Sequence, residues 1–105
     1  MLEVISRPSP EWRSRTPLLF IHGAWHGAWC WDRGWLDYFS DRGWHSYAMS
    51  LRNHGNSPAN GSLRFTRHRG FIEDIASVAG QFERPPVLIG HSMGGYLAQK
   101  YMEAH

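Results

Sequence analysis

The stretch Val87-Leu-Ile-Gly-His-Ser-Met-Gly-Gly95 decides the fold of this 105-residue chain. Its first three residues form an apolar run that predicts a buried strand. The residues that follow it, with Leu97, Ala98, Tyr101 and Met102 at helical spacing, predict a helix. The pattern Gly90-x-Ser92-x-Gly94 between them is typical of a strained strand-to-helix turn that holds a serine hydroxyl above a sheet. Its glycines let the backbone fold tightly and let the helix approach the strand.

Three further segments upstream predict strands. Leu18 to Ile21 is a continuous apolar run between Pro17 and Gly23, which is typical of a strand buried on both faces. Residues 45–51 predict another short strand, and residues 2–6 predict a short strand at the edge of the sheet.

Two amphipathic helices are predicted between the strands. From about residue 29 to residue 41 the aromatic side chains recur at helical spacing, and Gly43 fits the end of that helix. The second helix carries an apolar stripe and ends before Pro85-Pro86. The stripe consists of Phe71, Ile75, Val78 and Phe82.

Strands that alternate with helices predict an α/β fold with a mostly parallel sheet and helices on both faces. Residues 1–105 are interpreted as a portion of one such domain, because the chain is long enough for one core only. In parallel sheets, functional groups gather where the strands end. Both His22-Gly23 and Ser92 are expected at that edge.

Acyl transfer is the chemistry that this edge suggests. Negative charge then develops on a substrate carbonyl oxygen, and backbone N–H groups are the usual way to stabilise it. The residue after the serine, Met93, is one expected donor, and the loop after the earlier strand supplies Ala24 as the other. Two structural alternatives stay open: Ser92 as a helix cap, and His22-Gly23 as a glycine turn with a packing histidine.

Three motifs in this order resemble the α/β-hydrolase superfamily: residues 18–31, the Leu51-Arg-Asn-His-Gly-Asn-Ser57 loop and the Ile89–Gly95 turn. Esterases and lipases of the lysophospholipase-like and plant methyl-esterase-like branches are most similar. The resemblance implies that Ser92 is the nucleophile and that the N–H groups of Ala24 and Met93 form the oxyanion hole. Asn53 stands where the family has a glycine. Epoxide hydrolases and haloalkane dehalogenases of the superfamily use aspartate at the position of Ser92, so their chemistry is not expected.

The family's acid and histidine follow the nucleophile at a distance, whereas this chain ends thirteen residues after Ser92. Glu103 and His105 lie on or beyond a helix that leads away from the serine, and His91 is expected to point elsewhere. We therefore expect an N-terminal portion of a hydrolase with little activity alone. The strand at residues 87–89 would expose its far edge, through which self-association is expected.

Trp25, His22 and Gly23 are the predicted substrate-binding residues, with a small-molecule ester as the ligand. His22 is also expected to support the loop at Ala24 through hydrogen bonds. Trp25, Trp29, Trp31 and Trp35 could line an acyl or aromatic pocket near this loop. For Trp31 and Trp35 packing in the core is favoured over that alternative, because they share a helical stripe. The whole protein would then be an ester hydrolase. A lyase on the same fold, such as a hydroxynitrile lyase, and a non-catalytic binding protein are the alternatives.

The composition excludes several other classes. The net charge is +2, and the basic cluster of Arg64, Arg67, His68 and Arg69 is interpreted as a solvated helix start, so no nucleic-acid partner is expected. Cys30 is the single cysteine, which excludes an internal disulfide. No metal or organic cofactor is expected, and His22 and His26 are not interpreted as metal ligands. The chain shows neither a signal peptide nor a membrane span, which favours a cytoplasmic protein.

Overall fold

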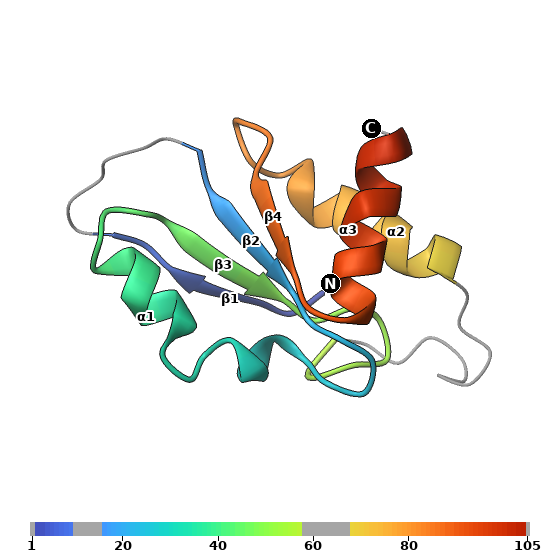
Figure 1. Ribbon diagram of the computed structural model, residues 1–105, viewed down its shortest axis with the longest axis horizontal. Coiled ribbons are helices and arrows are strands. Elements are labelled where there is room, and N and C mark those ends of the chain that lie inside the picture. Colours follow the sequence, from blue (N-terminus) through green and yellow to red (C-terminus); the bar gives the residue numbers. More distant parts are fainter. Residues whose placement is uncertain (1, 10–15, 58–67, 105) are drawn as a thin grey trace.

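Four strands form one sheet in the order β1-β3-β2-β4. The computed structural model describes residues 2–9, 16–57 and 68–104. Strand β2 (Leu18–Ile21) lies between β3 (Ser46–Met49) and β4 (Val87–Gly90) and runs parallel to both, while β1 (Val4–Arg7) pairs with β3 in the antiparallel direction. The prediction of a mostly parallel sheet is therefore confirmed. Figure 1 shows that β2, β3 and β4 end on the same side of the sheet.

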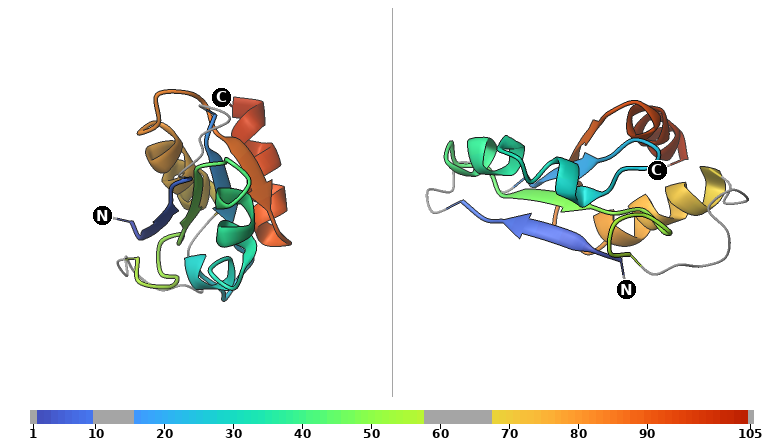
Figure 2. Two further views of the ribbon diagram at one scale, coloured as in Figure 1. Left: turned by 90° about the vertical axis from the view of Figure 1, so that its left-hand side faces the viewer. Right: turned by 90° about the horizontal axis from the view of Figure 1, so that it is seen from below.

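Each face of the sheet is covered by its own set of helices. The side chains of β2 alternate: Leu19 and Ile21 join a core with α2 (His68–Ala79) and α3 (Met93–Ala104). Leu18 and Phe20 join a second core with the 3-10 helix η1 (Ala28–Cys30) and with α1 (Trp35–Ser40). Figures 1 and 2 show α1 and α2 on opposite sides of the sheet. All four β2 residues are buried, as their apolar run predicted.

The helix expected from about residue 29 to residue 41 is wrong as a single element. The structure divides it into η1 and α1, with a turn at residues 31–34 between them. Gly34 has a φ of +114°, a conformation that other residues rarely adopt, and it stands immediately before α1. The aromatic spacing that predicted one helix therefore spans two short ones.

Helix α2 begins three residues before the predicted stripe and ends before Phe82. Three stripe residues, Phe71, Ile75 and Val78, are buried against the sheet. Phe82 lies beyond the helix and packs on Tyr47, with ring centroids 4.8 Å apart.

The loop after β3 is attached to α2 by Arg52, which forms several hydrogen bonds with Asp74.

Strand β4 lies at the edge of the sheet, and this arrangement corrects one expectation. The run of residues 87–89 predicted a strand buried on both sides, yet the Val87 side chain is 49% exposed. The predicted open far edge is confirmed, because β4 has a strand neighbour, β2, on one side only among the described residues. Within those residues no helix is both long and apolar enough to cross a membrane.

Candidate active site

Ser92 occupies a strained turn between β4 and α3. Its φ is +56°, and among the described residues Trp25 and Asn53 are the other non-glycine residues with positive φ. Such a conformation is costly for a residue with a side chain, and it places the exposed Ser92 at the carboxyl end of β4. The predicted strand-to-helix turn is present at this position.

Two glycines beside Ser92 are required by backbone contacts. A Cβ atom on Gly90 would collide with the carbonyl group of Gly94 and the Cα of Gly95. One on Gly94 would collide with the carbonyl oxygens of Ile21 and His22. Gly90 therefore lets α3 approach the end of β4, as the glycine pattern predicted, and Gly94 lets the helix pack on the end of β2 as well.

The loop after β2 lies against this turn. A Cβ atom on Gly23 would be 3.3 Å from the Cβ of Ser92 and 3.3 Å from the carbonyl oxygen of His91. After the buried Gly23, the next three residues, Ala24, Trp25 and His26, are exposed. The structure thus brings together the two loops that the sequence predicted to meet.

His22 holds this loop from beneath. Its ring Nε2 accepts the N–H of Leu51 at 3.0 Å, so the proton lies on Nδ1 and is donated to the carbonyl oxygen of Gly23 at 2.6 Å. Burial lowers the pKa of His22 to about 4, and the nearby His54 and His26 act in the same direction. The side chain is completely buried and has no surface for substrate. His22 therefore supports the loop through hydrogen bonds, as the sequence predicted, and its predicted contact with substrate is withdrawn.

The turn at Ser92 and the loop after Gly23 each carry one backbone N–H group without an acceptor among the described residues. The amides of Gly94, Gly95 and Tyr96 donate to the carbonyl oxygens of His91 and Ser92. Within the described residues, neither the N–H of Met93 nor that of Ala24 donates a hydrogen bond. Unpaired donors of this kind can stabilise an anion that forms beside the serine.

The tryptophans divide between core and surface. Trp31 packs on Phe20 with ring centroids 4.9 Å apart, which confirms its predicted core position. The same prediction is wrong for Trp35, which is 53% exposed and stacks edge-to-face with Trp31. Trp25 is 75% exposed in the loop beside Ser92, where a substrate could contact it.

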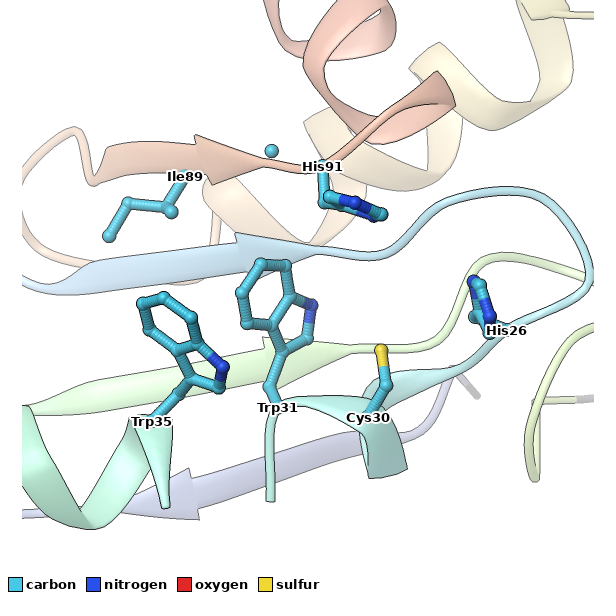
Figure 3. A pocket seen from close by; sticks show the side chains of 7 residues that line it. His26, Cys30, Trp31, Trp35, Ile89 and His91 are labelled. Carbon is cyan, nitrogen blue, oxygen red and sulfur yellow. The ribbon is translucent and has the colours of Figure 1, made fainter. Parts of the chain in front are cut away.

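A pocket of about 490 Å³ opens on the α1 face of the sheet next to the turn. Figure 3 shows Ile89 and His91 on one side of this space. Cys30, Trp31 and Trp35, from the segment that contains η1 and α1, face them from the other side. Most of its wall is apolar, with His26 at one end.

The described residues offer Ser92 no catalytic base, since its hydroxyl makes no hydrogen bond among them. Glu103 pairs with Lys100 at 3.3 Å on the exposed side of α3, and His105 lies outside the described part of the chain. In that part no three His, Cys, Asp or Glu side chains converge as metal ligands would. Of the basic cluster, Arg64, Arg67 and the His68 side chain also lie outside it, whereas Arg69 is exposed.

Comparison with known proteins extends these observations. Residues 18–104 match the model of the alpha/beta hydrolase family. Probable esterase PIR7A of Oryza sativa subsp. indica is 35% identical over 89 residues, which cover 81% of this chain and 32% of the rice protein.

Solved structures agree with the match. The thioesterase domain from the curacin biosynthetic pathway has a TM-score of 0.81 at 27% identity, over 96% of this chain and 36% of that domain. An epoxide hydrolase of Bacillus megaterium in complex with an inhibitor has a TM-score of 0.78 at 25% identity, over 98% of this chain and 34% of the enzyme.

These alignments leave most of each relative unmatched, because the chain spans about a third of their length. The sheet of four strands with its helices is accordingly a partial form of the fold. The family model nevertheless covers all the elements from β2 to α3, including the Ser92 turn and the Gly23 loop. The chain therefore belongs to the alpha/beta hydrolase family.

Proposed function

We propose that residues 1–105 form the N-terminal portion of a single hydrolase domain whose complete form cleaves carboxylic esters through Ser92. The main support is that the Ser92 turn lies against the Gly23 loop. Each of the two segments has one backbone N–H, of Met93 and of Ala24, that donates no hydrogen bond within the described residues. The similarity to a probable esterase of rice supports an ester as substrate. A serine in the turn supports an acyl-enzyme route.

The proposed reaction has two steps. The Ser92 oxygen attacks the ester carbonyl carbon while its proton passes to a base, and the carbonyl oxygen becomes an anion between the N–H groups of Ala24 and Met93. Collapse of this intermediate breaks the bond to the alcohol, which leaves with a proton, and the acyl group stays on Ser92. Water then releases the acid by the same route. We further propose that Trp25 and the Gly23 backbone contact the substrate. The exposure of Trp25 and the closeness of Gly23 to Ser92 support this proposal.

The 105-residue chain by itself should react slowly. A hydrolase without its base keeps an acceleration of about 10³ to 10⁴ over water from the oxyanion hole and binding. Ser92 without a hydrogen-bonded histidine is therefore expected to acylate slowly, but faster than the other serines of the chain.

A fluorophosphonate probe tests this proposal, with intact and peptide mass spectrometry to locate the label. We expect slow labelling confined to Ser92 and absent from Ser92→Ala. Rapid labelling at rates typical of complete serine hydrolases would contradict the slow reaction. No labelling of a folded, monodisperse chain would contradict the nucleophile and favour a binding protein.

A further inference from the structure

The far end of the loop at residues 23–27 is held by Ser50, a residue just past the end of β3. The N–H of Ala28, which follows the loop, donates to Ser50 Oγ at 2.8 Å. Ser50 is completely buried, so this bond is shielded from water. The near end of the loop is held by His22 through the carbonyl oxygen of Gly23. Buried side chains therefore fasten both ends of the loop, and the exposed Ala24 lies between them.

Glu3 orients the Ser50 hydroxyl. The hydroxyl donates to a Glu3 carboxylate oxygen at 2.6 Å, which leaves its lone pairs for Ala28. The backbone and side-chain amides of Asn56 each donate to the same carboxylate at 2.9 Å. Partial burial opposes ionisation of Glu3, but these hydrogen bonds outweigh it and lower its pKa. The carboxylate is thus ionised at neutral pH and serves only as an acceptor.

The segments around Ser50 are closely packed, so that a change at Ser50 reaches the loop at residues 23–27. A Cβ atom on Gly27 would lie 3.0 Å from the Cα of Gly55, and one on Gly55 would collide with Ser50 Oγ. The N-terminal strand, the loop at residues 23–27 and the loop after β3 therefore meet at one buried hydroxyl.

We propose that Ser50, held by Glu3, is a positioning residue that aims the Ala24 N–H at the oxyanion. This inference rests on the proposed function of the Ser92 site. Removal of the Ser50 hydroxyl leaves the buried Ala28 N–H without an acceptor, and the loop then moves to satisfy that donor. Because Gly23 contacts Ser92, such movement changes the distance between the serine and the Ala24 amide.

Ser57 provides a matched control. Its Oγ accepts the N–H of Glu3 at 2.9 Å and donates to the carbonyl oxygen of Ser50 at 2.5 Å, so it belongs to the same network. It makes no hydrogen bond to the loop at residues 23–27 among the described residues. Ser57→Ala therefore weakens the attachment of β1 without releasing Ala28.

The experiment compares Ser50→Ala, Ser57→Ala and the wild-type chain by ¹⁵N NMR. We expect Ser50→Ala to speed hydrogen exchange of the Ala28 amide by about tenfold relative to that of Phe20 in β2, and to shift the Ala24 amide signal. Ser57→Ala should leave both unchanged. If Ser50→Ala proves unfolded, Glu3→Gln, which retains the hydroxyl, should give the same changes in weaker form.

Fluorophosphonate labelling of the same variants separates this inference from the proposed function. Labelling of Ser92 should slow about tenfold in Ser50→Ala and less than about twofold in Ser57→Ala. An unlabelled wild-type chain contradicts the proposed function, whereas the NMR comparison still decides whether Ser50 holds the loop. Equal changes in the two serine variants, or an unmoved Ala24 signal in Ser50→Ala and Glu3→Gln, would overturn the positioning role.

Discussion

Gly23 and Ser92 lie in direct contact: a Cβ atom on Gly23 would stand 3.3 Å from that of Ser92. The loop after β2 and the turn after β4 are 69 residues apart in sequence, and the parallel pairing of the two strands brings them together. A side chain at position 23 would press on the serine. We expect Gly23→Val to displace the loop and to slow fluorophosphonate labelling of Ser92 by at least about tenfold, with retention of most of the folded structure by circular dichroism.

The neighbouring glycines of α3 should differ sharply in tolerance. A Cβ on Gly94 would meet backbone oxygens of β2 that have little freedom to move, whereas one on Gly95 would meet Gly90 at 3.5 Å, an ordinary contact. Gly94→Ala should therefore destabilise the chain by about 2 kcal/mol or more. Gly95→Ala should remain within about 1 kcal/mol of wild type. Urea denaturation measures both, and equal losses would contradict the packing described above.

The buried His22 makes stability depend on pH. Its pKa of about 4 in the folded chain lies below the ordinary value, so the unfolded chain binds the proton more readily. Stability is therefore complete above about pH 6.5 and falls as the pH decreases towards 4, by ~3 kcal/mol in total. His22→Asn should flatten this part of the profile. Urea denaturation between pH 7.5 and 4 tests it, and a wild-type curve as flat as that of the variant would refute the assignment.

The ion pair between Arg52 and Asp74 should matter more than its neighbour. Asp74 is buried and accepts from the Arg52 backbone at 2.8 Å and from its guanidinium at 2.8 Å. Glu73 lies 3.7 Å from the same guanidinium and is mostly exposed. Asp74→Ala should lower the free energy of unfolding by about 3 kcal/mol, and Glu73→Ala by less than about 1 kcal/mol. Thermal unfolding of both variants provides the comparison.

The open edge of β4 should promote self-association. The N–H groups of Val87 and His91 bond to the β2 side, so the main-chain groups of Leu88 and Gly90 face outward. No charged residue protects this strand. We predict oligomers whose proportion rises with concentration in light scattering coupled to size exclusion, and a shift towards monomer in Val87→Lys. Val87→Thr serves as the control, and a monomeric wild-type chain at high concentration would contradict the prediction.

The strands and the meeting of the two loops could be predicted from sequence because local patterns determine them. The four consecutive apolar residues of β2 predict burial on both faces, and a serine among glycines directly after a strand predicts a tight turn. The break at Gly34 could not be predicted from spacing, since the aromatic residues keep their helical period across it. Nor could the exposure of Trp35, which depends on what else covers that face.

The roles of Glu3 and Ser50 depend on tertiary structure. Their contact follows from the pairing of β1 with β3, 47 residues apart in the chain, and neither residue belongs to a recognisable motif. His22 could be predicted in part. Its position at a strand end suggested both contact with substrate and support of the loop, and its burial and its bond to Leu51 leave only the support.

The most direct test of the Ser92 site replaces residue 93 by the α-hydroxy acid analogue of methionine, which turns the Met93 N–H into an ester oxygen and leaves the side chain in place. The rate of fluorophosphonate labelling at Ser92 is then compared with that of the unmodified chain. Loss of one oxyanion donor should slow the reaction by about 100-fold while the folded structure is retained. An unchanged rate in a folded chain would contradict the role of Met93 and, with it, the oxyanion site proposed beside Ser92.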